Sequence, residues 1–139
     1  MSDDAAAAWR EDRRAASAAH ADALARRLAA ESARARAMIE EWVAAALVDG
    51  PAPVPLVARS YDGRRRFRTP LQGWYLRRDE SVGIDTAGRF YVLRVPGGLG
   101  AMLRGVEPVP QDPPLVIGAG GKDGESLDLD LALARVRQA

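Results

Sequence analysis

The chain has 139 residues, 47% of them hydrophobic, a formal net charge of +1 and no cysteine. This length suits one ordinary domain or a small domain with an appendage, and the balanced charge excludes a globally polyanionic or polycationic protein. The lack of cysteine excludes disulfides, thiolate metal sites and a cysteine nucleophile.

The N-terminal sequence MSDDAAAAWRED is acidic, whereas a signal peptide needs a basic start and then an apolar run. The longest apolar run, residues 42–48, is far shorter than the ~20 residues that span a bilayer. We therefore expect a cytoplasmic protein with no membrane partner.

An α-helix is predicted over residues 3–48, which contain nineteen alanines and no glycine or proline. Alanine is the strongest helix former, and Gly50-Pro51 is typical of a helix end. About 45 residues at 1.5 Å each give a helix of roughly 65 Å, about twice the diameter of a small domain. Because no turn signal interrupts the helix, we expect it to project and to meet a partner.

The larger side chains of this helix follow a partial heptad pattern, which Glu31 interrupts. Ile39, Val43, Leu47 and Val48 widen the apolar face near the C-terminal end, so we expect that end to dock on the chain's own β-domain. Further back, the helix is expected to pair as a coiled coil, either with a second copy or with another protein. The predicted helix interface consists of Leu24, Leu28, Met38 and Trp42.

After a proline-rich linker, the hydrophobic period changes from that of a helix to that of strands. Turn signals separate the short strands that follow, which indicates an antiparallel meander. The strands are expected at 56–61, 64–69, 74–78, 82–85, 90–95, 106–109 and 115–117, with turns at 62–63, 70–73, 79–81 and 86–88 and one helical turn at 99–103. A C-terminal helix is expected over about 129–137, although residues 127–133 also fit a strand.

The predicted fold class is therefore α+β. A long Ala-rich helix (1–50) is joined by a proline-rich linker (51–55) to a small β-domain with a C-terminal helix (56–139). The β-domain is expected to be an antiparallel meander or a small SH3-like barrel.

Three segments resemble those of small uncharacterised bacterial proteins from GC-rich genomes: GWYLRR (73–78), FYVL (90–93) and DPPLVIG (112–118). This resemblance implies that residues 73–127 form one unit, and it implies no function. A GC-rich origin also fits the basic residues, because nineteen of the twenty are arginine. Arginine is then the ordinary solubilising cation of this chain, which weakens arguments from arginine alone.

No catalytic, metal-binding or cofactor-binding residues are predicted. The only histidine, His20, lies in the most loosely held part of the helix, where a surface role is expected. The glycine-rich loop 118–124 lacks the ending of a phosphate-binding loop, and the nearby acids do not have the spacing of a calcium loop. An enzyme would need a site built from Arg77 or Arg78 beside Asp79 and Glu80.

The positive charge is concentrated in residues 59–78, which carry seven arginines and one aspartate. These arginines could be the solvated side of an edge strand, which would protect that edge from aggregation. They could also bind nucleic acid, with tyrosines stacking on bases, or bind an acidic protein. The candidate binding residues are Arg59, Tyr61, Arg64, Arg65, Arg66, Arg68, Tyr75 and Arg77.

The expected function is that of a non-enzymatic macromolecule-binding or scaffolding protein, which acts through its helix and its β-domain surface. The alternative is a nucleic-acid-binding protein that uses the basic aromatic hairpin 59–78. The expected partners are a protein or a second copy at the helix, with nucleic acid as the other possibility.

Overall fold

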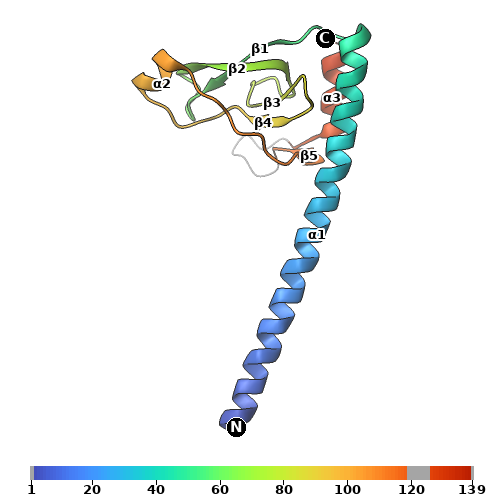
Figure 1. The fold of residues 1–139 in the computed structure, drawn as a ribbon, viewed down its shortest axis with the longest axis vertical. Coiled ribbons are helices and arrows are strands. Elements are labelled where there is room, and N and C mark those ends of the chain that lie inside the picture. The colour runs from blue at the N-terminus through green and yellow to red at the C-terminus, as the bar shows by residue number, and fades with distance from the viewer. Residues whose placement is uncertain (1, 119–125, 139) are drawn as a thin grey trace.

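The computed structural model describes residues 2–118 and 126–138, and its longest element is helix α1 (Asp3–Asp49). The Ser2 side chain caps the helix by accepting a hydrogen bond from Ala5 N at 3.2 Å, and two aspartates occupy the first turn. Its 47 residues give a length of about 70 Å. The N-terminal part extends far from the rest of the chain (Figure 1). The predicted helix is confirmed.

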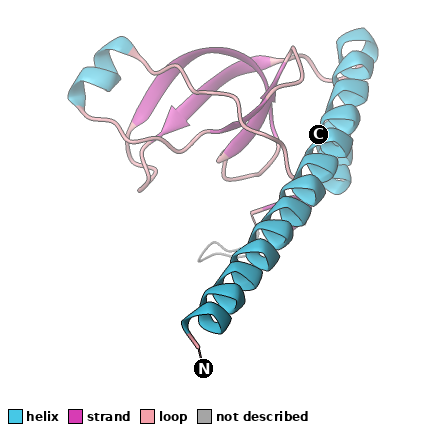
Figure 2. Cartoon of the chain, turned by 60° about the horizontal axis from the view of Figure 1, so that its bottom comes forward, coloured by secondary structure: helices cyan, strands magenta, loops and turns pink. Residues whose placement is uncertain are grey.

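Four antiparallel strands form the main sheet, in the order β1 (Val54–Arg59), β2 (Arg66–Tyr75), β3 (Val82–Asp85) and β4 (Phe90–Val92). The sheet curls (Figure 2). Beyond β4 the chain meets the end of β1, where Arg59 N donates to Leu93 O and Val95 N donates to Arg59 O, each at 2.9 Å. These two bonds join the outer edges of the sheet at one end. The fold is α+β, as predicted.

The expected turn at 70–73 is wrong, because β2 runs through it without interruption. The register between β1 and β2 shifts here, so that residue 56 lies opposite several residues of β2. Pro70 lies in this irregular segment, where its missing N–H removes no regular ladder bond. Thr69 Oγ1 donates to Leu56 O at 2.6 Å and accepts from Leu71 N at 3.1 Å, which stabilises the segment.

The expected strand at 106–109 is also wrong, since these residues form no strand. Pro108 and Pro110 remove two N–H donors from this part of the chain. The segment is held at its two ends instead. Val106 N donates to Arg68 O, and Gln111 N donates to Phe90 O, each at 2.8 Å.

The remaining elements follow the predictions closely. Helix α2 (Leu99–Arg104) is the expected helical turn, and β5 (Val116–Ile117) pairs with β6 (Leu127–Asp128). Helix α3 (Leu129–Gln138) begins directly after β6. Residues 127–133 are therefore a two-residue strand followed by a helix, which settles the alternative that the sequence left open.

The main core lies between one face of the sheet and the helices α1 and α3, which lie side by side (Figure 1). Trp42 of α1 and Trp74 of β2 meet edge to face, with ring centroids 5.0 Å apart. Both indole N–H groups are satisfied, because Trp42 Nε1 donates to Leu133 O and Trp74 Nε1 donates to Pro51 O, each at 2.9 Å. The last third of α1 is thus part of the β-domain's core, and the predicted docking is confirmed for Ile39 and Val43. It is wrong for Leu47 and Val48, which are 54% and 85% exposed beyond the covered part of the helix.

A second, smaller cluster lies on the other face of the sheet and contains Leu56, Leu71, Tyr91 and Leu93, with Tyr75 packed against it. Trp74 and Tyr75 face opposite sides, as do Phe90 and Tyr91. The predicted alternation along these strands is confirmed. Within the described part of the chain, no helix is long and apolar enough to cross a membrane.

Candidate functional site

The β1–β2 hairpin is closed by a tight turn that presents its arginines to solvent. Asp62 Oδ1 accepts hydrogen bonds from Ser60 Oγ at 2.6 Å and from Arg64 N at 3.0 Å. The bond from Ser60, and then that from the Arg64 backbone, lower the pKa of Asp62. Gly63 has φ +76, a left-handed conformation that only glycine adopts without strain. The turn is therefore specified by its own residues and not by contacts elsewhere.

Along β2 the side chains alternate, so that Phe67 is fully buried while Arg66 and Arg68 on either side of it are exposed. Arg64 and Arg65 at the turn are exposed as well. The Tyr61 side chain is 73% exposed. These five residues, Tyr61, Arg64, Arg65, Arg66 and Arg68, are called the hairpin tip below.

An open groove of about 520 Å³ runs beside the hairpin tip. One wall of the groove is formed by residues of the hairpin, and the other by the segment 95–97. Arg65 Nη1 lies 3.5 Å from Gly97 O, and Arg68 Nη2 donates to Leu103 O at 2.9 Å. The predicted solvation of the four tip arginines is thus present, although two of them also contact backbone carbonyls.

The other three candidate binding residues do not lie at the tip. Arg59 Nη2 pairs with Glu80 Oε1 at 3.0 Å, and Arg77 Nε lies 3.7 Å from Asp79 Oδ1. Tyr75 is partly buried, and its hydroxyl accepts a hydrogen bond from Val57 N at 2.9 Å. The surface expected from the sequence is therefore divided, and Arg59, Tyr75 and Arg77 belong to a polar network inside the fold.

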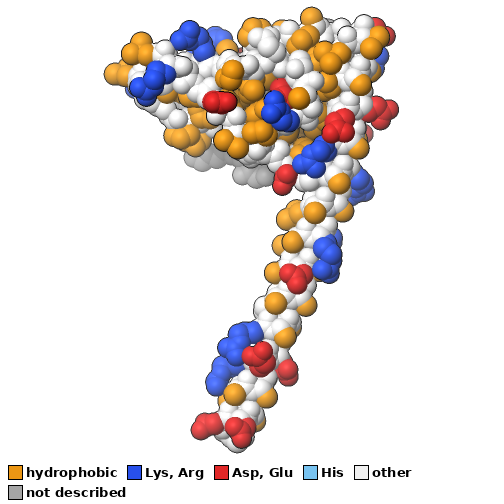
Figure 3. Space-filling model, in the orientation of Figure 1, with side chains coloured by type: hydrophobic (Ala, Val, Ile, Leu, Met, Phe, Trp, Pro, Cys, Tyr) orange, Lys and Arg blue, Asp and Glu red, His pale blue; other side chains and the backbone are white. Residues whose placement is uncertain are grey.

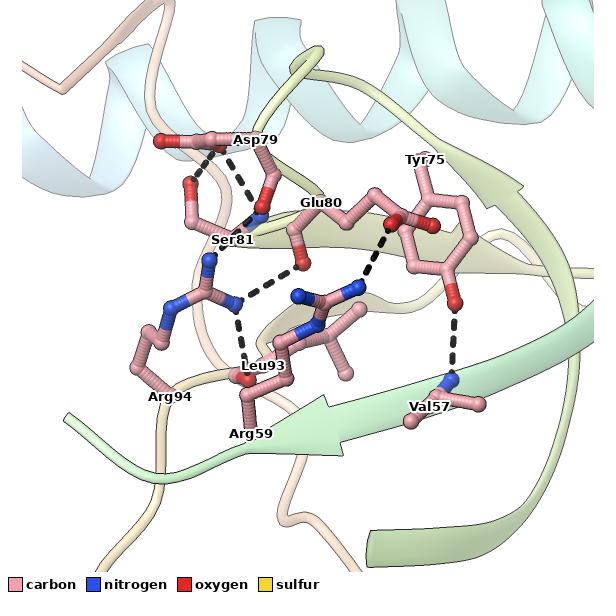
Figure 4. A network of polar contacts seen from close by, with 8 residues as sticks. All are labelled: Val57, Arg59, Tyr75, Asp79, Glu80, Ser81, Leu93 and Arg94. Carbon is pink, nitrogen blue, oxygen red and sulfur yellow. Dashed lines mark hydrogen bonds and ion pairs between the residues drawn. The ribbon is translucent and has the colours of Figure 1, made fainter. Parts of the chain in front are cut away.

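Figure 4 shows this network around the β2–β3 turn, with Arg94 on one side and Arg59 on the other. The Arg94 guanidinium donates to three backbone carbonyls: Asp79 O at 2.6 Å, Glu80 O at 3.2 Å and Leu93 O at 3.4 Å. It therefore ties the turn to the strand that closes the sheet. Nothing in the sequence singles out Arg94, because its partners are backbone atoms fourteen or more residues away, or its own neighbour.

Two acidic residues of this turn have fixed positions. Burial raises the pKa of Asp79, but hydrogen bonds from the Ser81 hydroxyl and N–H, with the charge of Arg77, outweigh this effect and lower it. Glu80 has φ +61, which is rare and strained for a residue with a side chain. In this conformation its backbone carbonyl accepts from Arg94 while its carboxylate reaches Arg59.

The residues that an enzyme reading would need are only partly assembled. Arg77, Arg78 and Asp79 line a hollow of about 270 Å³, together with Ser126, Leu127 and Arg135. Glu80 is absent from this lining because it pairs with Arg59. The lowered pKa of Asp79 favours a carboxylate that accepts hydrogen bonds over an acid that donates a proton.

Asp85 is the one charged side chain that is buried within residues 2–118 and 126–138. Its Oδ1 accepts from Ala87 N at 3.0 Å and Arg89 N at 2.9 Å, and its Oδ2 accepts from Arg89 Nε at 2.9 Å and Tyr91 Oη at 2.8 Å. Burial first, and then the hydrogen bond to Asp85, raise the pKa of Tyr91 to about 12. With every lone-pair direction used inside the β3–β4 turn, Asp85 holds the turn and has no capacity left for a ligand.

On α1, the predicted interface residues fall into two environments. Met38 and Trp42 pack in the chain's own core, so they are not part of an exposed seam. Leu24 and Leu28 are 45% and 54% exposed, and none of residues 2–30 is buried. Glu31 marks the boundary, since its carboxylate accepts a hydrogen bond from Leu115 N at 3.1 Å.

The remaining candidates carry little chemistry. His20 is exposed on α1, as expected. Most of the glycine-rich loop 118–124, and the acids Asp123 and Glu125, lie outside the described residues. No group of three or more His, Cys, Asp or Glu side chains able to hold a metal ion occurs among the residues that the structure describes.

Comparison with known protein families, with curated proteins and with solved structures finds no match for this chain. Its function must therefore be inferred from its own geometry. Two exposed features remain after the internal contacts are assigned. They are the free part of α1 and the end of the β-domain that carries the hairpin tip.

Proposed function

We propose that this chain is a non-enzymatic scaffolding protein, in which α1 binds a helix of a partner while the β-domain is displayed at its other end. The observation that carries the proposal is the unequal burial of α1. Its last third is built into the core, whereas residues 2–30 extend past the domain with none of them buried (Figure 1). A helix of this length can hold a partner bound near its N-terminus at a distance from the β-domain.

The exposed leucines continue the face by which α1 docks on its own domain. Leu24 stands seven residues before Glu31, Leu28 stands seven residues before Ala35, and Trp42 is a further seven residues on. This spacing of threes and fours places them on one stripe of the helix. The stripe is covered by the domain from Glu31 onward and is open before it, so a second helix could extend the same packing.

The free part of α1 has what it needs to be helical before a partner binds. Alanine and arginine dominate its sequence, Ser2 caps it, and Arg13 stacks over Trp9 with its Cζ 4.8 Å from the ring centroid. A preformed helix loses less conformational entropy on binding than a disordered segment would. The small alanines around residues 15–19 also let a second backbone approach closely. We take a second copy of the chain as the partner to test first.

The test is light scattering of the full chain at tens of micromolar, compared with the double variant Leu24→Ser and Leu28→Ser. We expect a dimer that dissociates at least tenfold more readily in the variant, because two partly exposed leucines lose the contact that they gain on association. The matched control is Leu47→Ser with Val48→Ser, which removes two exposed apolar side chains from the domain end of the same helix.

A monomeric wild-type chain would remove self-association and leave only a different protein as the partner of α1. Equal association of the two double variants would show that the stripe with Leu24 and Leu28 is not the contact surface. If the wild-type chain is monomeric, deleting residues 1–22 should leave the melting of the β-domain unchanged, because only an unpaired part of the helix is removed.

A second candidate function, nucleic-acid binding at the hairpin tip, is favoured by one observation. Four arginines and an exposed tyrosine lie together on one hairpin. Arginines can neutralise the phosphate backbone of a nucleic acid, and a tyrosine can stack on its bases. A fluorescence titration against mixed DNA and RNA oligonucleotides at two salt concentrations tests it. Absence of binding at the lower salt concentration would retire this candidate.

A further inference from the structure

Helix α2 presents its apolar side chains to solvent and its small residues to the protein. Leu99 and Leu103 are 71% and 79% exposed, and Met102 between them is exposed as well. Their spacing of three and four places all three on one face of the helix. Large exposed apolar side chains gathered in one place mark interaction surfaces more often than chance. They lie at the far end of the β-domain from α1 (Figure 1).

The outward direction of these side chains is imposed by close contacts beneath α2. A Cβ on Gly97 would lie 2.7 Å from Phe67 Cζ and 3.2 Å from the Ala101 side chain, so the space under the helix is filled. At the other end, Gly105 has φ +80, and a Cβ there would lie 2.7 Å from Arg68 O. Arg68 also donates to Leu103 O at 2.9 Å. The leucines therefore cannot fold inward without displacing β2.

The apolar face is flanked by cations. The hairpin tip adjoins α2, because Arg65 contacts Gly97 O just before the helix and Arg68 donates to Leu103 O within it. Arg104 folds over Gly100 on α2 itself. Two acids, Asp62 and Glu107, line the adjoining hollows, so five arginines leave this end with a net charge of +3. Hydrophobic and basic side chains lie together at this end of the domain (Figure 3).

We propose that α2 and the hairpin tip together form a docking surface for an anionic lipid bilayer, with Leu99, Met102 and Leu103 entering the interface and the arginines contacting headgroup phosphates. A convex apolar end framed by cations is the arrangement by which proteins without a membrane span bind a bilayer. Tyr61 lines the adjoining groove together with the segment 95–97 that leads into α2, and tyrosine is typical of the headgroup level.

Nucleic-acid binding would account for the basic residues of this surface but not for its apolar residues. It would use the arginines and Tyr61, but it offers nothing apolar to a leucine pair on a convex helix. The expectation of no membrane partner came from the absence of a spanning segment, and binding to the bilayer surface requires no such segment. The inference does not depend on α1, which lies at the other end of the molecule.

The first test is sedimentation of the full chain with vesicles of phosphatidylcholine alone, and of phosphatidylcholine mixed with phosphatidylglycerol, at low and physiological salt. We expect binding to the mixed vesicles only, weakened by salt. The double variant Leu99→Ser and Leu103→Ser should lower the partition coefficient at least tenfold. So should Arg64→Gln with Arg66→Gln, at roughly fivefold for each charge near the surface.

The matched control is Val48→Ser with Leu131→Ser, two exposed apolar residues of α1 and α3 away from this end, which should bind vesicles like the wild type. Since the chain has no cysteine, Leu103→Cys can be labelled alone with a polarity-sensitive fluorophore. Its emission should shift to the blue on adding mixed vesicles, whereas the same label at Val48→Cys should not respond.

Each other outcome overturns the proposal. Vesicle binding that survives the leucine variant would reduce the surface to a charge effect. Oligonucleotide binding without vesicle binding would assign the arginines to nucleic acid. A wild-type chain that sediments with neither vesicle leaves no lipid role for α2, whatever light scattering shows for α1.

Discussion

Seven of the nine arginines between residues 59 and 94 lie in two regions that the fold treats in opposite ways. At the hairpin tip, Arg64, Arg65, Arg66 and Arg68 are exposed to solvent, and two of them, Arg65 and Arg68, contact the backbone carbonyls of Gly97 and Leu103. Around the β2–β3 turn, Arg59, Arg77 and Arg94 are largely covered and bound to carboxylates and carbonyls of the turn. Figure 4 shows two of them, Arg59 and Arg94. The residue type is the same, and the surroundings differ.

A high density of charged residues along a sequence therefore does not by itself define a charged surface. A guanidinium whose donors are already held by the protein must break those bonds to bind a ligand, while a solvated one exchanges only water. The tip arginines are therefore available for partners, and the turn arginines stabilise the fold. The two regions should therefore differ in how much their arginines contribute to the free energy of unfolding.

The largest effect is expected where a charge is most enclosed. Asp85→Ala leaves two backbone N–H groups and the Tyr91 hydroxyl without their acceptor, so the free energy of unfolding should fall by about 3–5 kcal/mol. Urea denaturation measures this. The control is Asp112→Ala, whose carboxylate pairs with Arg36 at 3.1 Å on the open surface, and there the loss should stay below about 1 kcal/mol. Equal losses would contradict the role given to Asp85.

The second prediction applies one substitution to both regions. Arg94→Met keeps most of the aliphatic length and removes the donors to Asp79 O, Glu80 O and Leu93 O, so stability should fall by about 2 kcal/mol. Arg66→Met on the exposed side of β2 should change it by less than about 0.5 kcal/mol. If both variants unfold at the same urea concentration, the division into two regions is wrong.

Much of the architecture could be predicted from local sequence. The nineteen alanines and Ser2 specify α1, and the turn residues around Gly63 and Gly88 separate strands whose side chains alternate as expected. Such signals are local because a turn conformation or a helix end depends on a few neighbouring residues. The turn wrongly expected at 70–73 rested on Pro70 as a turn signal, whereas the strand wrongly expected at 106–109 gave no weight to Pro108 and Pro110. Pro70 is tolerated because β1 changes register opposite it, and a partner strand's register is not visible in one segment.

The sites were less predictable, for the same reason. Arg59 and Tyr75 were placed on the predicted binding surface because they neighbour the basic stretch, but Glu80 and Val57 bind them across the sheet. The outward face of α2 depends on Phe67, more than thirty residues before Leu103, which fills the space beneath it. Contacts between residues far apart in the chain decide which polar and apolar groups remain free.

A third prediction uses pH to examine the buried region. The pKa of Tyr91 is about 12 in the folded chain against 10.0 in the unfolded one, so the unfolded chain loses this proton first as pH rises. The stability that Tyr91 supplies is therefore fully present below pH 10 and is lost between pH 10 and 12. Tyr91→Phe should cost about 1 kcal/mol at neutral pH, and this difference from wild type should vanish in the alkaline range. Urea denaturation at both pH values measures it, and a constant difference would contradict it.

The smallest effect on stability belongs to the hairpin tip, and it is the one that matters most for function. Replacing Arg64, Arg65, Arg66 and Arg68 together with Ser removes four solvated charges and two contacts to carbonyls of the α2 region, so the free energy of unfolding should change by less than about 1 kcal/mol.

Binding should respond very differently in the same quadruple variant. If the tip contacts duplex DNA, the slope of log affinity against log salt should be about −3 to −4 for the wild type, because each neutralised phosphate contributes about −0.9, and the variant should flatten it. If the tip contacts anionic vesicles, the same variant should abolish their salt-sensitive binding. A quadruple variant that unfolds at a clearly lower urea concentration than the wild type would show that the tip arginines stabilise the fold as the turn arginines do. The distinction between the two regions would then be wrong.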